Sequence, residues 1–279
     1  MTDLRKTPED WEKLLQEVCK TACEVGDFLR SERKSFQRTR VEEKGIHNYV
    51  SYVDKESEKR LIKILHDLLP EAGFIAEEGH GSYQNEPYCW LIDPLDGTTN
   101  YIHDQAPYCV SIALCDQKEM LLGVVYEVCR DELFYARKDG GAWLRSAGQT
   151  AHPIHVSDIT DSEEAFIGMG LPYDSQNYSP MAQGLIRELY GQVAGIRILG
   201  SAAAELCYIA AGRSDGRIEF QLGPWDIAAG SLIIREAGGR ITDTAGKDLF
   251  YNSKEVIASN GKIHDFLLKK ITTCLKYEK

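Results

Sequence analysis

The stretch "WLIDPLDGTTN", Trp90 to Asn100, joins an apolar strand to two aspartates and a glycine turn. Asp93 and Asp96 flank Pro94, whose ring fixes the backbone and removes an N–H donor. Carboxylates at the end of an apolar strand cost free energy unless they are paired or hold a cation. The stretch therefore predicts a buried strand that delivers its acids to a specific partner.

The turn behind this strand has the outline of a phosphate-ester site. The carbonyl of Leu95 can face the same point as the two aspartates, and all-oxygen ligands of this kind suit Mg²⁺. Gly97 and Thr98 can open a short helix, whose free N–H groups favour an anion such as phosphate. Taken alone, the motif is also typical of a helix N-cap and turn, in which Asp caps, Pro turns and Gly bends.

Two further acidic segments favour the metal site over the cap. "IAEEG" places Glu77 and Glu78 after another short apolar strand, and "GPWDIAAG" places Asp226 at a helix start behind a tight turn. Each is separately typical of a solvated turn or a cap. Together they provide enough strand-end and helix-start acids for a shared metal cluster.

The first half of the chain predicts helices plus a mostly antiparallel sheet. Thr7-Pro8-Glu9-Asp10 is typical of a helix start, and apolar residues recur at helical spacing from Trp11 to Leu29. A second helix is predicted from Asp54 to Leu69, where Pro70 ends it. The segments "YCVSIALC", "LLGVVYEV" and "ELFYAR", separated by turn-like residues, predict an antiparallel meander.

The second half alternates strands and helices, which is typical of an α/β arrangement. The predicted strands are "EAFIGMG", "GIRILG", "DGRIEFQL" and "VIASN". The predicted helices are "YSPMAQGLIRELYGQVA", Ser201 to Ala211, "WDIAAGSLIIREAG" and Lys262 to Cys274. The polar stretch 149–162 is the expected boundary. We thus predict an α+β half, 1–150, with most metal ligands, and an α/β half, 151–279, that supplies Asp226 and substrate contacts.

Charge and composition disfavour several classes of partner. The 279 residues include 43 acidic and 32 basic ones, a net charge of −11 that repels a phosphate backbone or an anionic membrane. We therefore expect neither nucleic acid nor a membrane as a partner. Without an N-terminal apolar segment or an apolar run of about 18 residues, the chain is expected to be soluble and cytoplasmic. The eight cysteines form no C-x-x-C pair and are expected to be small buried hydrophobes in a reducing compartment.

The motifs together resemble a known family. "DPLDGTTN", preceded by "EEG" and followed by "PWDIAAGSLIIREAGG", resembles the inositol monophosphatase family of Mg²⁺-dependent, lithium-sensitive sugar phosphatases. The resemblance covers nearly the whole chain, from Trp11 to Asn260. It implies a layered α-β-α-β-α sandwich of the inositol monophosphatase/fructose-1,6-bisphosphatase type. It also implies a homodimer and inhibition by Li⁺.

The resemblance implies two to three Mg²⁺ ions. Their ligands fall on Glu77, Asp93, the carbonyl of Leu95, Asp96 and Asp226. In the family pattern Glu77, Asp93 and the Leu95 carbonyl hold one ion, and the three aspartates hold a second. A weaker third ion is expected near Glu77.

Catalytic and substrate roles are likewise carried over from the family. Thr98 matches a threonine that orients the attacking water with Glu77, and Asp54 matches an acid that hydrogen-bonds this threonine. Lys44 matches a lysine near the phosphate, although a surface lysine is the alternative. The remaining expected substrate contacts are Asp96, Gly97, Thr98, Gly200, Ser201, Ala202, Glu219 and Asp226. Arg197 is expected to be structural or interfacial.

The resemblance implies an inositol-phosphate phosphatase that hydrolyses myo-inositol monophosphate with a metal-activated water. The tail "TTNYIH" resembles the inositol monophosphatase branch, whereas relatives that act on 3′-phosphoadenosine 5′-phosphate carry Lys and Phe there. A fructose-1,6-bisphosphatase or a histidinol-phosphate phosphatase of the same fold is the alternative, so the expected partner is a small polyol or sugar phosphate. A non-catalytic regulatory protein is disfavoured, because every expected ligand is present.

Overall fold

A computed structural model describes residues 7–37, 41–45, 48–249 and 251–274, and only the backbone of 44, 45 and 48. Its larger sheet is formed by the chain's first half. In spatial order its strands are β3 (Ala72–Ala76), β4 (Tyr88–Asp96), β5 (Cys109–Asp116), β6 (Met120–Glu127), β7 (Glu132–Arg137), β8 (Ala142–Ser146) and β9 (His152–Pro153). Only the β3–β4 pair in this sheet is parallel, so the predicted antiparallel meander is confirmed.

The smaller sheet comes from the second half and is mixed. Its spatial order is β11 (Gly195–Arg197), β10 (Phe166–Met169), β12 (Gly216–Phe220), β14 (Glu255–Ser259) and β13 (Arg240–Thr242). Strand β10 pairs in parallel with β11 and β12, as the strand–helix alternation predicts. The β14 strand runs antiparallel to both of its neighbours, because the described residues between β13 and β14 contain no helix that could return the chain.

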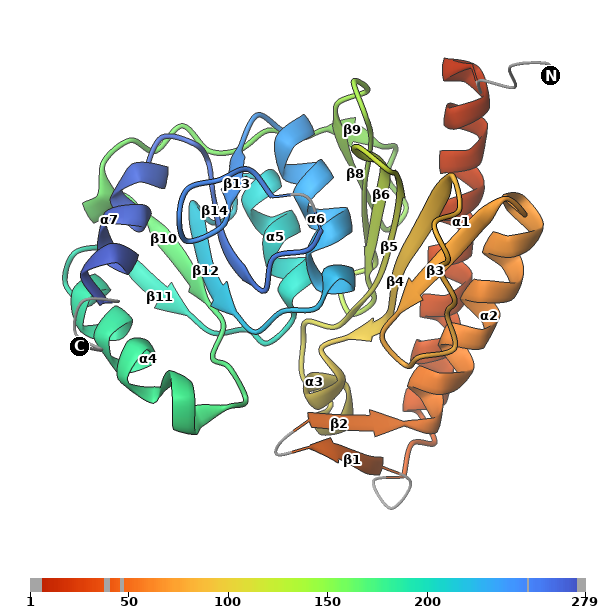
Figure 1. Ribbon diagram of the computed structural model, residues 1–279, viewed down its shortest axis with the longest axis horizontal. Coiled ribbons are helices and arrows are strands. Elements are labelled where there is room, and N and C mark those ends of the chain that lie inside the picture. Colours follow the sequence, from red (N-terminus) through yellow and green to blue (C-terminus); the bar gives the residue numbers. More distant parts are fainter. Residues whose placement is uncertain (1–6, 38–40, 46–47, 250, 275–279) are drawn as a thin grey trace.

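Helices separate and cover the two sheets. They are α1 (Pro8–Arg33), α2 (Tyr52–Leu68), α3 (Thr98–His103), α4 (Ser175–Leu189), α5 (Ala202–Ala210), α6 (Pro224–Glu236) and α7 (His264–Cys274). Figure 1 shows α1 and α2 outside the larger sheet, α5 and α6 between the sheets, and α4 and α7 outside the smaller sheet. The expected α-β-α-β-α sandwich is confirmed.

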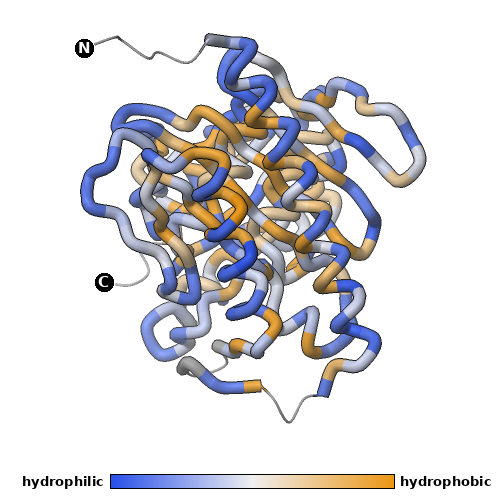
Figure 2. The backbone as a smooth tube through the Cα atoms, turned by 90° about the vertical axis from the view of Figure 1, so that its right-hand side faces the viewer, coloured by the Kyte–Doolittle hydropathy of each residue, from blue (hydrophilic) through white to orange (hydrophobic). Residues whose placement is uncertain are grey.

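Hydrophobic cores fill the spaces between these layers. Figure 2 shows hydrophobic segments running through the interior and hydrophilic ones at the periphery. The middle core packs α5 and α6 against both sheets and draws residues from Cys89 to Ala258. The division of the chain at 149–162 stays a prediction, since the middle core draws residues from both halves.

Local signals set the helix ends. Thr7 and Asp10 form a capping box in front of Pro8, as the sequence predicts. Helix α2 begins at a second capping box, which is made by Ser51 and Asp54. The sequence patterns missed the hairpin of β1 (Val41–Gly45) and β2 (Asn48–Ser51), the short helical turn Ser162–Glu164, and strands β8, β9 and β13.

All eight cysteines are free thiols. Six are buried, which confirms their predicted role as small hydrophobes. The prediction is wrong for Cys129, which the turn between β6 and β7 exposes, and Cys23 is half-buried. Within the described ranges, no helix is long and apolar enough to cross a membrane.

Candidate active site

Strand β4 carries two aspartates into the middle of the molecule. Its pairing with β5 is regular up to Asp93, opposite Ser111, and resumes at Asp96, opposite Cys109, so the chain bulges between them. Pro94 lies in this bulge, where its missing N–H leaves no ladder donor unpaired. The bulge re-aims both carboxylates while keeping them buried, because Asp93 is 2% exposed and Asp96 8%.

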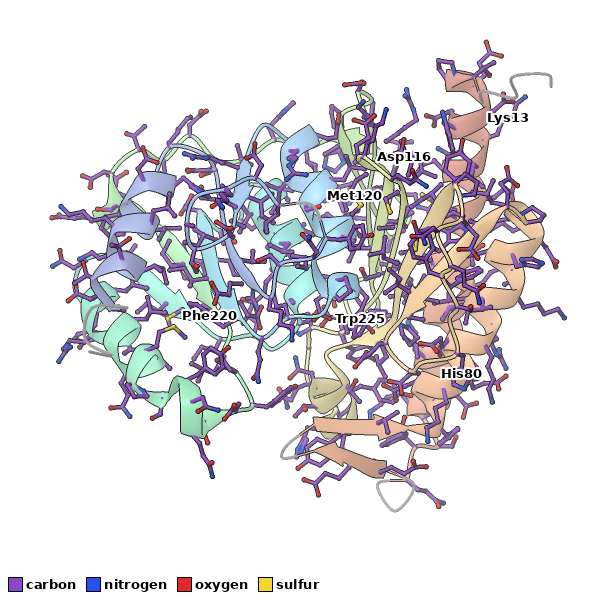
Figure 3. The ribbon with its side chains drawn as sticks, in the orientation of Figure 1. Lys13, His80, Asp116, Met120, Phe220 and Trp225 are labelled. Carbon is purple, nitrogen blue, oxygen red and sulfur yellow. The ribbon has the colours of Figure 1, made fainter. Side chains whose placement is uncertain are left out.

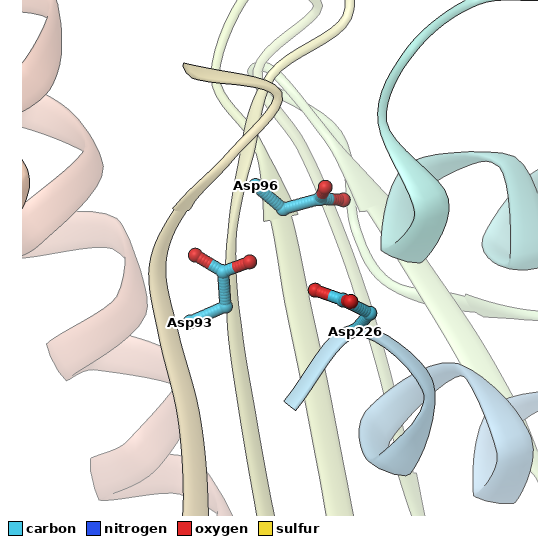
Figure 4. Close-up of side chains that lie close together, drawn as sticks. All are labelled: Asp93, Asp96 and Asp226. Carbon is cyan, nitrogen blue, oxygen red and sulfur yellow. The ribbon is translucent and has the colours of Figure 1, made fainter. Parts of the chain in front are cut away.

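Asp226 joins them from the other half of the chain. It lies in the first turn of α6, behind Pro224, and its Oδ2 accepts a hydrogen bond from the Gly223 N–H at 2.7 Å. Figure 4 shows the carboxylates of Asp93, Asp96 and Asp226 converging. One oxygen from each lies within 4.8 Å of the others. We call these three residues the acidic cluster.

Burial and mutual repulsion raise the pKa values of the cluster. Burial raises the pKa of Asp93 well above its ordinary value, and the charges of Glu77, Asp96 and Asp226 add to it. Burial likewise raises the pKa of Asp226 well above its ordinary value, reinforced by Asp96 and Glu77. At Asp96 burial raises the pKa, while hydrogen bonds from the start of α5 oppose the increase. The ionised cluster therefore needs a positive charge beside it.

Asp96 also caps helix α5. Its Oδ2 accepts hydrogen bonds from the Ser201 hydroxyl and the Ala203 N–H, both at 2.7 Å, and its Oδ1 accepts from the Ala202 N–H at 3.2 Å. Helix α5 has no side-chain cap of its own, so Asp96 satisfies its free amides from another element. Ser201 was predicted to line the pocket. Its side chain instead lies behind Asp96, 1% exposed.

Glu77 follows strand β3, and its N–H donates to the Ile92 carbonyl on the neighbouring strand at 3.3 Å. The turn behind it is held by Glu58, a fully buried residue of α2. Glu58 accepts from the N–H groups of Glu78 at 2.7 Å and His80 at 2.9 Å, and it bonds His80 Nδ1 at 2.7 Å. The buried carboxylate thus fixes the direction in which the chain leaves β3.

The Thr98 hydroxyl lies between two of the predicted residues. Its Oγ1 is 3.0 Å from Asp54 Oδ1 and 3.0 Å from the Leu95 carbonyl oxygen. Asp54 is fully buried and also accepts from the N–H and hydroxyl of Ser51. With Asp54 accepting the hydroxyl proton, the lone pairs of Thr98 Oγ1 can accept a hydrogen bond from another group.

Gly97 makes the turn into α3 possible. Its φ of 93° lies in the left-handed region, and a Cβ there would lie 2.9 Å from the Pro107 carbonyl oxygen. Asn100, three residues after Gly97 in the first turn of α3, donates to the carbonyls of Pro107 at 2.8 Å and Leu199 at 2.7 Å. This amide therefore ties α3 to the loop that enters α5, across the two halves of the chain.

These groups line one cavity of about 370 Å³. The predicted residues on its wall are Glu77, Asp93, Leu95, Asp96, Gly97, Thr98, Gly200, Ala202, Glu219 and Asp226. Phe220 and Trp225, which are labelled in Figure 3, also line it. Asp54 lies behind Thr98. Lys44 belongs to β1, but its side chain lies outside the described part of the structure.

Sequence reasoning missed several residues that hold this wall. Arg217, 1% exposed on β12, pairs with Glu219 and with Glu205 of α5. The only signal in the sequence was the spacing of Arg217 and Glu219, which puts both on one face of a strand. In sequence, Asn100 is typical of a turn and Glu58 of the solvated face of a helix, so neither is marked as part of the site.

The donor set fits a divalent cation. Within the described ranges, no Lys, Arg or His pairs with Asp93 or Asp226, although each has a strongly raised pKa. Buried carboxylates with this spacing are the ligands that Mg²⁺ takes in proteins. Of the predicted metal ligands, Asp93, Asp96 and Asp226 thus converge, and Glu77 and Leu95 line the same cavity.

Comparisons with known proteins agree with this geometry. The model of the inositol monophosphatase family matches residues 10–276. The chain is 36% identical over 259 residues to an inositol-1-monophosphatase of Mesorhizobium japonicum, spanning 92% of this chain and 96% of that protein. It is 34% identical over 263 residues to a Pseudomonas aeruginosa protein named Nus factor SuhB, spanning 92% and 95%. The solved IMPase structure of Thermotoga maritima gives a TM-score of 0.84 at 32% identity, covering 94% of this chain and 98% of that one.

Proposed function

Since the chain belongs to the inositol monophosphatase family, whose members are phosphatases, we propose that it hydrolyses myo-inositol monophosphate to myo-inositol and phosphate. The observation that carries the proposal is the convergence of Asp93, Asp96 and Asp226 beside Thr98 in one cavity. Hydrolysis of phosphate monoesters is among the slowest uncatalysed reactions in water. A catalyst for it must position water and neutralise charge, and this cavity is suited to both.

Glu77, the acidic cluster and the Leu95 carbonyl would hold two to three Mg²⁺ ions. Bound there, the metal would lower the pKa of water and neutralise charge on the phosphoryl oxygens and the leaving oxygen. Fixing the donors is the protein's own contribution. The bulge at Pro94 aims Asp93 and Asp96, and the first turn of α6 brings Asp226 to them.

Thr98 and Glu77 position the attacking water. Asp54 takes the hydroxyl proton of Thr98 in a hydrogen bond, which leaves Oγ1 free to accept one from water. The Glu77 carboxylate on the same cavity wall accepts the proton that the water loses. The N–H groups of Gly97 and Thr98 donate to the phosphoryl oxygens.

The leaving group faces the second half of the chain. Gly200 and Ala202 leave room beside the phosphate, and Glu219 accepts hydrogen bonds from substrate hydroxyls. Lys44, which belongs to the β1–β2 hairpin, binds the phosphate group of the substrate. Inhibition by Li⁺ follows if this ion replaces one Mg²⁺.

The substrate is tested by rates on three phosphates. Phosphate release with saturating Mg²⁺ is compared for inositol-1-phosphate, fructose-1,6-bisphosphate and histidinol phosphate. We expect the highest kcat/KM on inositol-1-phosphate. A higher value on either of the others would replace the substrate while leaving the reaction class in place. No release from any of them would refute the proposed function.

The proposed assembly is a homodimer. In the described part of the chain, the exposed large hydrophobic residues fall between 171 and 198: Leu171, Tyr173, Ile186, Tyr190 and Ile198. Leu171, Tyr173 and Ile198 line the cavity, which leaves Ile186 and Tyr190, near the end of α4, as exposed apolar side chains available to a protein–protein contact. Light scattering coupled to size exclusion should give twice the chain mass of 31.3 kDa. A monomer at micromolar concentration would contradict the proposal.

Binding to nucleic acid is tested beside the phosphatase activity, since one relative carries the name Nus factor. The net charge of −11 predicts no binding to DNA or RNA at physiological salt. Fluorescence anisotropy with short labelled DNA and RNA measures this. Saturable binding in the micromolar range would contradict the charge argument.

A further inference from the structure

A buried arginine lies behind the wall of the cavity. Arg217 and Glu219 lie on one face of β12, because side chains two apart in a strand point the same way. Glu219 Oε2 accepts from Arg217 Nε at 3.0 Å and from Nη2 as well. On its other side, Arg217 Nη1 forms a salt bridge with Glu205 Oε2 of α5. The geometry of this contact is not that of a well-aligned hydrogen bond.

Each carboxylate of this triad is connected to the cavity, one directly and one through the backbone. Glu219 lines it directly. Glu205 reaches it through the backbone, because its Oε1 accepts from the N–H groups of Leu199 at 3.3 Å and Gly200 at 3.2 Å, and Gly200 lines the cavity. One guanidinium thus braces two separate parts of the wall, a strand and the loop before α5.

The neighbouring strand makes room for the triad. Gly168 of β10 lies opposite Arg217 in the sheet, and a Cβ there would lie 2.8 Å from Glu205 Oε2. A Cβ on Gly170 would lie 1.9 Å from Glu219 Oε1, which is closer than atoms can approach. The alternating glycines of "GMG" therefore leave the space that the buried charges occupy.

Stability alone gives little reason for charges at this place. Moving ions out of water costs several kcal/mol each, and apolar residues of similar volume often replace a buried ion triad without loss of stability. What the charged triad provides is a fixed direction. A guanidinium that donates two N–H groups to one carboxylate defines its orientation, and a lysine at the same position would not.

We propose that Arg217 is a positioning residue that orients Glu219, and through Glu205 the Gly200 loop, towards the hydroxyl-bearing part of the substrate. The inference rests on the proposed phosphomonoesterase function. It assigns to Arg217 the selectivity for leaving groups rich in hydroxyls over leaving groups that lack them.

The test compares two substrates, inositol-1-phosphate and p-nitrophenyl phosphate, whose leaving group has no hydroxyl to meet Glu219. The measured quantity is the ratio of their kcat/KM values. In Arg217→Met this ratio should fall about tenfold or more, since a misplaced charged hydrogen-bond partner costs that much. The fall should appear mainly as a higher KM for inositol-1-phosphate. In a Glu219→Gln background, Arg217→Met should lower the ratio by less than it does in wild type, because only the route through Glu205 and the Gly200 loop remains.

Two variants complete the experiment. Arg213→Met removes an ion pair with Glu132 that lies apart from the cavity, so it should lower the melting temperature without changing the ratio. Arg217→Lys keeps the positive charge but loses the paired N–H donors of the guanidinium. The ratio of kcat/KM values in this variant should therefore lie between those of wild type and Arg217→Met. If the Met variant does not fold, the Lys variant decides the matter.

An unchanged ratio would overturn the inference, whether seen in Arg217→Met or, in its place, in Arg217→Lys. Equal loss on both substrates leaves the ratio unchanged and would mean that Arg217 is structural only. A wild-type protein that hydrolyses neither substrate would instead overturn the proposed function, and the inference with it. The two failures are therefore distinguishable in one set of assays.

Discussion

Replacing Asp93 by asparagine should stabilise the metal-free protein. The substitution keeps the shape of the side chain and the oxygen that accepts from the Leu95 N–H at 2.9 Å. It removes the negative charge of a residue that is only 2% exposed. Carboxylate oxygens of the cluster lie within 4.8 Å of one another. Two like charges at that distance repel by about 3 kcal/mol at an effective dielectric constant of about 20.

The size of the effect is bounded by protonation. Asp93 has a strongly raised pKa, so it takes up a proton rather than bear the full repulsion, and each unit by which its pKa exceeds the unfolded value costs about 1.4 kcal/mol. We therefore expect a gain on the order of 3 kcal/mol in the free energy of unfolding without metal. For a chain of this size that raises the melting temperature by roughly 6–10 °C.

The assay is thermal unfolding with a chelator and with Mg²⁺. In wild type, Mg²⁺ at about 100 times its Kd should add about 2.7 kcal/mol. In Asp93→Asn that increment should be lost, so the variant is the more stable protein in chelator and gains nothing from the metal. Asp215→Asn is the control, because Asp215 is a buried acid outside the cluster, bonded by the Phe166 N–H at 2.7 Å. A loss of stability in chelator, or a full Mg²⁺ increment in Asp93→Asn, would refute the reasoning.

Three further substitutions have definite outcomes. His264 is fully buried and its pKa is lowered from 6.5 to about 4, first by burial, so the unfolded chain takes up the proton before the folded protein does. The contribution of His264 to the free energy of unfolding is therefore fully present above pH 6.5, and it falls by about 3 kcal/mol as the pH drops to about 4. Urea unfolding should show this fall in wild type and not in His264→Gln. Thr98→Val removes the hydroxyl bonded to Asp54 and should lower kcat about a hundredfold with an unchanged circular dichroism spectrum, whereas a rate within about twofold of wild type would exclude its role. Gly97→Ala forces a Cβ against the Pro107 carbonyl at a φ of 93° and should cost about 1–3 kcal/mol in urea unfolding, so an unchanged midpoint would contradict the strain.

Local patterns in the sequence predict the strands and helices of both halves and the pair Asp93 and Asp96, whereas the layered sandwich and the full set of ligands follow from the family resemblance. Period-two apolar runs give the meander, strand–helix alternation gives the second half, and Asp93 and Asp96 share one short motif. The hairpin β1–β2 escaped prediction because "VEEKG" and "NYVS" carry little apolar alternation. The antiparallel direction of β14 depends on how β13 and β14 are connected, which the pattern of a single segment does not indicate.

The residues that support the site depend on tertiary packing. In the sequence Glu58 is one of several charged residues on a polar helix and would be expected to face solvent. In the structure it is buried and accepts hydrogen bonds from the turn at Glu78 and His80. Arg217 becomes meaningful only when α5 brings Glu205 beside it. Ser201 stands in a motif that suggests a pocket wall, but the start of α5 turns its hydroxyl towards Asp96. Such contacts join residues far apart in the chain, so spacing does not reveal them.

The central claim is that the acidic cluster makes this protein a metal-dependent phosphatase. Phosphate release from inositol-1-phosphate, measured after chelation and again as Mg²⁺ is restored, tests it most directly. Activity should be absent in chelator, return with Mg²⁺ in wild type, and stay absent in Asp226→Asn, which loses one cluster carboxylate. Full activity in chelator, or in Asp226→Asn, would contradict the account.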